Sequence, residues 1–167
     1  RHTLEEAFWK VFKRGDYEHL DPLLNRLKLD YLKNPKDPLI ASKIGFLHAW
    51  RVTERARRQY PKPDLTDDLT LAARYFEAAH LLEPENPVTH GFYAAFLLAD
   101  GTIHDNKKKT TAAWFKAQQA IKAWPEFNQF TVAYLLNALP FEPKKSQMGI
   151  DLLDDVMQRC LGEAPEL

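Results

Sequence analysis

Few residues in this chain have the type and spacing that catalysis or metal binding requires. The six histidines are scattered along it, at His2, His19, His48, His80, His90 and His104. The chain contains neither a His-Glu-x-x-His metal motif nor a phosphate-binding glycine loop. Its only serines, Ser42 and Ser146, lie outside any strand–turn–helix nucleophile elbow. These observations predict a protein that is not an enzyme, with no catalytic residues, no cofactor and no metal site.

Two histidines come nearest to forming a site. His80 ends one expected helix and His90 opens the next, so the turn between them brings the two rings within reach of each other. Glu83 or Glu85 could add a third metal ligand, but the spacing matches no zinc pattern, and we expect structural roles for both histidines. The single cysteine, Cys160, lies on an apolar helical stripe and is expected to be buried packing rather than a nucleophile.

Composition limits the class of protein and partner. The 167 residues are 45% hydrophobic, which is enough for one core and one domain. Lys plus Arg and Asp plus Glu both number 23, so the chain lacks the basic excess typical of nucleic-acid binders. One cysteine excludes an intrachain disulfide framework, and no apolar run is long enough to span a membrane. The expected partner is therefore a protein or peptide.

The sequence is compatible with more than one cellular compartment. The sequence begins at Arg1 rather than Met, so we expect a processed or trimmed chain. A single thiol is compatible with the cytoplasm, and equally with the periplasm or secretion after removal of a signal peptide.

Apolar residues recur at helical spacing, and prolines fall between the apolar runs. Leu20, Leu24 and Leu27 share one helical face, for example. Because proline removes an amide donor and clashes inside a helix, the prolines are expected to separate helices. The pattern predicts an all-α protein of about eight helices, at roughly 3–13, 17–33, 38–58, 67–83, 87–99, 107–123, 128–139 and 146–161.

Two segments repeat the same small-residue pattern. Ala72, Phe76, Ala79 and Pro84 have the spacing of Ala113, Ala117, Ala120 and Pro125. Gly45 and Ala94 supply small residues in the helices that precede them. This pattern resembles the tetratricopeptide repeat, although two connections are about 15 and 7 residues longer than that family's and its characteristic Trp is missing from the first helices.

The resemblance implies a fold and a binding surface. It implies a single domain, 1–167, built as a right-handed α-solenoid of antiparallel hairpins at roughly 3–33, 38–83, 87–123 and 128–161. The first helix of each hairpin would line a concave groove that binds a protein segment, which makes the chain a scaffold. The groove residues expected from the family's positions are Trp9, Phe12, Phe46, Trp50 and Leu98. The alternative is that a terminal segment or a neighbouring helix covers these aromatic residues and makes them core.

Charge and the solenoid ends suggest two further contacts. Arg55, Arg57 and Arg58 lie in the long connection 52–66 and are candidates for a secondary basic contact, although interleaved acids make a simply solvated edge the other interpretation. The last helix carries apolar residues, among them Leu153 and Val156, and no capping helix follows it. The second functional hypothesis is therefore a self-assembling subunit that stacks through its ends into a homo-oligomer or filament.

Overall fold

The computed structural model describes residues 2–55, 65–138 and 143–161. Within these ranges the chain is helical and contains no strand, which confirms the predicted all-α class with eight α-helices. The elements are α1 (His2–Arg14), the short 3-10 helix η1 (Tyr17–His19), α2 (Leu20–Lys33), α3 (Pro38–Thr53), α4 (Leu65–Leu82), α5 (Pro87–Ile103), α6 (Lys107–Ala123), α7 (Pro125–Ala138) and α8 (Pro143–Leu161).

Two helices begin with the same local device. The Asp37 side chain accepts hydrogen bonds from the first free amides of α3, and the Asn86 side chain does the same for α5. Pro38 and Pro87 follow these caps at the first helical position. A backbone N–H at that position has no partner within the helix, so its absence in proline costs no hydrogen bond. The sequence therefore sets the starts of α3 and α5 locally.

The proline at 125 has a different role from the predicted one. We expected it to end one helix and the next helix to begin near residue 128, but α7 begins at Pro125 itself. Only Trp124 separates it from α6, and its backbone is extended (φ −149°, ψ 87°), as steric contact with a following proline favours. The predicted start of this helix was therefore three residues, or about one turn, too late.

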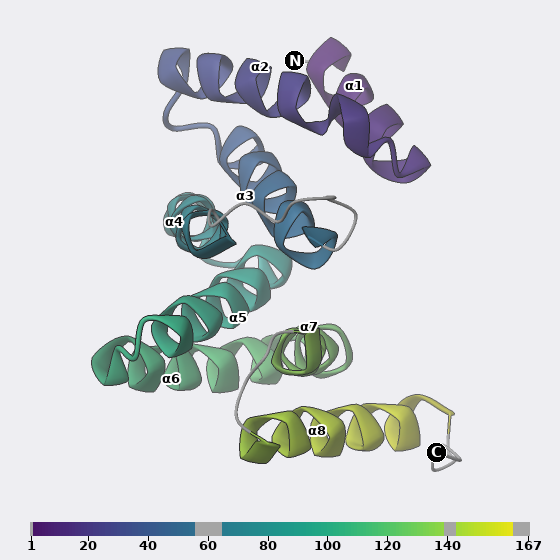
Figure 1. The fold of residues 1–167 in the computed structure, drawn as a ribbon, viewed down its shortest axis with the longest axis vertical. Helices are drawn as coiled ribbons and strands as arrows, with labels where there is room; N and C mark the ends of the chain where they lie inside the picture. The colour runs from purple at the N-terminus through teal and green to yellow at the C-terminus, as the bar shows by residue number, and fades with distance from the viewer. Residues whose placement is uncertain (1, 56–64, 139–142, 162–167) are drawn as a thin grey trace.

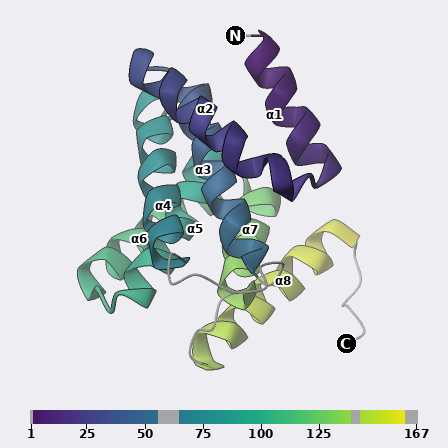
Figure 2. The same cartoon turned by 45° about the horizontal axis from the view of Figure 1, so that its top comes forward.

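Consecutive helices pack against one another along the chain. From α3 onward each helix contacts the next, and α5 also packs against α7. The elements follow the long axis of the molecule, from α1 and α2 at one end to α8 at the other (Figure 1). Turning the molecule shows α1 to one side of α2 and α3, near α2 only at the turn that joins them, and α1 makes few contacts with the rest of the chain (Figure 2).

The small residues of the repeated pattern lie where helices approach closely. Ala72, Ala79, Ala113, Ala117 and Ala120 are all fully buried. A Cβ atom on Gly45 would lie 2.9 Å from the ring of Phe76, so α3 and α4 meet with no room for a side chain. Glycine and alanine at these positions therefore permit the observed helix spacing.

The buried side chains form two apolar cores joined by one phenylalanine. The first core lies among α1, α2 and α3, and the second extends from α3 to α7. Phe46 of α3 packs against both. The residues around Phe46 consequently lie at the junction of the two halves of the molecule.

Candidate functional site

A cavity of about 210 Å³ opens where four helices converge. Its wall is formed by Phe12 of α1; by Phe46, Ala49, Trp50 and Thr53 of α3; by Phe92 and Phe96 of α5; and by Phe130, Thr131, Tyr134 and Leu135 of α7. Seven of these side chains are aromatic and none is charged. The surface that they form, called the aromatic cavity below, suits an apolar group rather than an ion.

The N-terminal wall is built by contacts between α1 and α3. The ring of Phe12 lies 5.3 Å from that of Trp50 and 6.4 Å from that of Phe46, centroid to centroid. Tyr17 meets the other side of Trp50 edge-on at 5.6 Å. Edge-to-face geometry at these distances is favourable for aromatic pairs, so this wall is pre-formed.

The opposite wall comes from equivalent positions of α5 and α7. Phe92 and Phe130 stand five residues after the proline that opens their helix, and Phe96 and Tyr134 stand nine residues after it. Phe92 is held by Phe46 at 4.8 Å and by Phe76 of α4 at 5.2 Å. Phe130 and Tyr134 stack on each other and remain 50% and 48% exposed. They form the open lip of the cavity.

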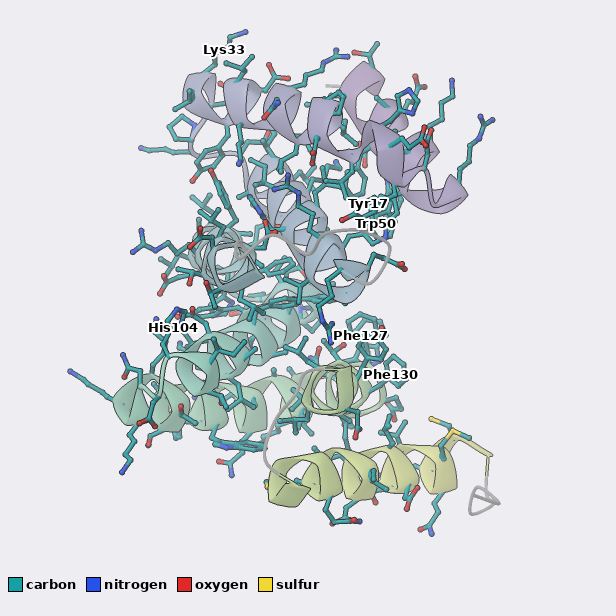
Figure 3. The ribbon with its side chains drawn as sticks, viewed as in Figure 1. Tyr17, Lys33, Trp50, His104, Phe127 and Phe130 are labelled. Carbon is teal, nitrogen blue, oxygen red and sulfur yellow. The ribbon has the colours of Figure 1, made fainter. Side chains whose placement is uncertain are left out.

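The aromatic lip lies on one edge of the molecule. Trp50, Phe127 and Phe130 lie along the same edge in Figure 3, and His104 lies on the opposite one. Phe127 extends the aromatic surface, because its ring contacts Phe92 at 6.1 Å and Trp124 at 4.8 Å. The site is therefore a strip of aromatic side chains with the aromatic cavity at its centre.

The structure brings together three of the five predicted groove residues. Phe12, Phe46 and Trp50 line the aromatic cavity, and the exposed Trp9 adjoins it through ring contact with Phe12 at 6.1 Å. Leu98 is different, because it is 2% exposed and belongs to the core that α5 shares with α6 and α7. The family's positions placed Leu98 in the groove, whereas on α5 it is Phe92 and Phe96 that face the cavity.

Sequence reasoning missed most of the opposite wall. Phe130 and Tyr134 were not predicted because the family's groove positions fall on other residues of α7, just as they miss Phe92 and Phe96 on α5, whose start was predicted correctly. A signal was present, since a proline followed five and nine residues later by aromatic residues occurs at both 87–96 and 125–134.

The predicted basic contact is described only in part. Arg55 donates a hydrogen bond from its guanidinium to the carbonyl oxygen of Val52 at 3.1 Å. Arg57 and Arg58 lie outside the described residues.

A second, larger cavity of about 810 Å³ lies between α1, the end of α2 and the start of α3. Charges of both signs line it and pair with one another. The Lys43 ammonium lies 3.6 Å from the Glu5 carboxylate, and that of Lys33 lies 3.8 Å from Asp30. With no single sign of charge, this cavity has no evident ligand class.

The two candidate histidines lie close together. The rings of His80 and His90 stack at 4.4 Å, so the predicted approach of these two histidines is confirmed. Among the described residues, no group of three or more His, Cys, Asp or Glu side chains is placed to hold a metal. Cys160 is exposed, so the expectation that it is buried was wrong, because the last turns of α8 lie beyond the helices that would cover it.

Within the part of the chain that the structure describes, no helix combines the length and hydropathy needed to cross a bilayer. Comparisons with protein-family models, with curated proteins and with solved structures find no match to this chain.

Proposed function

We propose that this chain is a non-catalytic interaction module that binds a protein segment by taking one bulky apolar side chain into the aromatic cavity. The observation that carries the proposal is the convergence of α1, α3, α5 and α7 on that one cavity. Exposed aromatic side chains surround an uncharged pit, and aromatic anchors of this kind are enriched at binding sites.

The size of the cavity supports a single anchoring side chain. Its volume of about 210 Å³ exceeds the ~150 Å³ of an engineered apolar cavity that binds benzene. Burying a Leu or Phe side chain contributes about 1.5–3 kcal/mol, and favourable contacts with aromatic rings add roughly 0.5–1.5 kcal/mol. Such an anchor gives specificity, while backbone and flanking contacts along the strip must supply the rest of the affinity.

The proposal includes a tetratricopeptide-like solenoid as the scaffold. In such a stack the first helices of successive hairpins face one side, and here every described residue that lines the cavity belongs to α1, α3, α5 or α7. The packing of α5 on α7 and the close approach at Gly45 support the same arrangement. The four hairpins would then form one domain.

Charge substitution at the exposed lip tests the proposal. Phe130→Glu with Tyr134→Glu places two carboxylates at the entrance of an apolar pit. The probe is a peptide selected from a random displayed library for binding to the wild-type chain. Its affinity for the double variant is expected to be at least about tenfold lower, equal to ~1.4 kcal/mol. Fluorescence anisotropy with the labelled peptide measures the loss, and circular dichroism shows whether the helices are retained.

The matched control is Phe115→Glu on α6. Phe115 is 63% exposed and does not line the cavity, so the same substitution there should leave peptide affinity unchanged. Equal losses at both positions, or a folded lip variant that binds with wild-type affinity, would contradict the proposal. Phe46 and Trp50 are unsuitable for this test because both are packed against core residues.

Self-assembly is the second candidate, and one observation favours it. Leu32 of α2 is 77% exposed, and Leu29 beside it is also exposed, at the α1–α2 end of the molecule. At the other end Val156 is buried and Leu152 packs against the core, so α8 presents less apolar surface than the hypothesis expected. The leucines of α2 are therefore the place where a second copy would dock.

A further inference from the structure

Two histidines lie face to face across the turn between α4 and α5. His80 is in the last turn of α4 and His90 in the first turn of α5. Their ring centroids are 4.4 Å apart with an interplanar angle of 25°. Nδ1 of His80 and Nε2 of His90 are both buried, and neither has a hydrogen-bond partner among the described residues.

The charged groups around the pair do not favour a proton on it. From α6, the Lys116 ammonium lies 5.0 Å from the centre of the Tyr93 ring, which itself lies 5.7 Å from His80. From α4, the Glu77 carboxylate acts on His80, but it already accepts a hydrogen bond from the Tyr93 hydroxyl of α5 at 2.7 Å. Of the described residues on α3 and α7, no charged group acts on either ring.

Burial and these neighbours shift the histidines in the same direction. Burial is the main cause that lowers the pKa of His80 below its ordinary value, and Lys116 adds to it against the smaller opposing effect of Glu77. Burial also lowers the pKa of His90, and the charges of His80 and Lys116 lower it further. The stacked arrangement consequently favours the neutral form of both imidazole rings.

We propose that the stacked His80–His90 pair makes the α4–α5 junction acid-labile, so that protonation separates the rings and loosens the contact between these helices. An unfolded histidine titrates near pH 6.5, whereas the folded pair takes protons only at lower pH. The unfolded state therefore binds more protons as the pH falls through ~6.5. The stability due to the neutral pair is complete above that pH and decreases below it.

The junction is connected to the aromatic cavity through α5. His90 stands two residues before Phe92, which forms part of the cavity wall. Loosening of this turn would displace Phe92 and weaken peptide binding at acidic pH. This second consequence rests on the proposed function, whereas the acid lability of the junction does not.

A histidine titration by NMR, together with urea unfolding at pH 7.5 and 5.5, tests the proposal. We expect the imidazole signals of His80 and His90 to titrate below about pH 6.5. In His80→Phe, which removes one titrating ring but keeps an aromatic partner, the pKa of His90 should move upward. The urea midpoint of the wild type should fall at pH 5.5, and that of His80→Phe/His90→Phe should fall clearly less.

His19→Gln is the control, because His19 is exposed and bonded to Asp16 rather than to another ring. Because Asp16 raises the pKa of His19, protonation of His19 stabilises the folded state, so this variant should show an acid-induced drop at least as large as that of the wild type. The proposal is overturned if the two signals titrate at or above 6.5, or if the double variant loses as much stability as the wild type. Should the double variant fail to fold, the titrations of the wild type and of His80→Phe still decide. Peptide affinity at the two pH values tests the link to the cavity separately.

Discussion

Asp100 is a buried carboxylate that is bonded to two neighbouring helices. It is 1% exposed near the end of α5, where one oxygen accepts a bond from the Thr70 hydroxyl of α4 and the other accepts one from the Lys109 ammonium of α6, each at 2.5 Å. Burial opposes ionisation, but the bonds from Lys109 and Thr70 outweigh it and hold the pKa of Asp100 below its usual value. One carboxylate thus ties three helices together.

Asp100→Asn should lower the free energy of unfolding by about 1–3 kcal/mol at pH 7, because it removes a charge-assisted bond and leaves buried donors poorly matched. Since the folded pKa of the carboxyl is depressed, its stabilisation is present above about pH 4 and is lost as the pH falls below. The variant should therefore lose less stability than the wild type between pH 5 and pH 2.5. Urea unfolding across that range measures both effects.

Asp105→Asn is the matched control for this change. Asp105 is exposed in the turn that follows and has a positive φ of 49°, which asparagine also tolerates. It should change stability by less than about 0.5 kcal/mol. Equal costs at positions 100 and 105 would show that the buried network contributes nothing.

Gly91 and Asn128 show how neighbouring elements are joined. The Asn128 amide of α7 donates hydrogen bonds to the carbonyls of Pro87 at 3.0 Å and Ala120 at 2.7 Å, linking α7 to α5 and α6. Its side-chain oxygen occupies the space beside Gly91, where a Cβ would lie only 1.9 Å away. The contact between α5 and α7, which positions both halves of the cavity lip, therefore depends on a missing side chain.

Gly91→Ala should destabilise the protein by roughly 1–3 kcal/mol through overpacking, despite the better helix propensity of alanine. Asn128→Ala should also destabilise it, through the loss of two buried bonds. Because Asn128→Ala removes the atoms that clash, the double variant should cost less than the two single changes added together. Strict additivity in chemical denaturation would show that the two residues do not act on each other.

How well the elements could be predicted depended on local signals. The starts of α3 and α5 were readable because Asp37-Pro38 and Asn86-Pro87 cap and open a helix without help from the rest of the chain. The start of α7 was not, because Pro125 follows α6 so closely that the same residue fits the end of one helix or the beginning of the next. That ambiguity explains the error in the start of α7, whereas Phe130 and Tyr134 were missed because they lie outside the groove positions of the family that the sequence resembles.

At the scale of the whole molecule, the site depends on how four helices converge. Phe12, Phe46 and Trp50 were predicted from the groove positions of the family that the sequence resembles, and they line the cavity. Their meeting with Phe92 and Phe130 could not be predicted, because it is set by the angles between helices, which side-chain packing determines rather than spacing along the chain. The same packing buried Leu98, which the family's positions had placed in the groove.

The exposed leucines of α2 make a prediction about solution mass. If copies associate through this end, light scattering after size exclusion should give a mass that rises above 19.4 kDa with concentration. Leu32→Glu should then return the mass to that of the monomer, because it places a charge in an apolar contact. A wild-type mass that stays at 19.4 kDa over a hundredfold range of concentration would exclude self-assembly through Leu32.

The most direct test of the interaction module is to find where a bound segment lies. Intermolecular NOEs between a library-selected peptide and the isotope-labelled chain report contacts between individual side chains. The account predicts NOEs from one bulky apolar side chain of the peptide to the rings of Phe46, Phe92 and Phe130, which surround the aromatic cavity. NOEs confined to residues outside the cavity, such as Phe115 on α6, would contradict it.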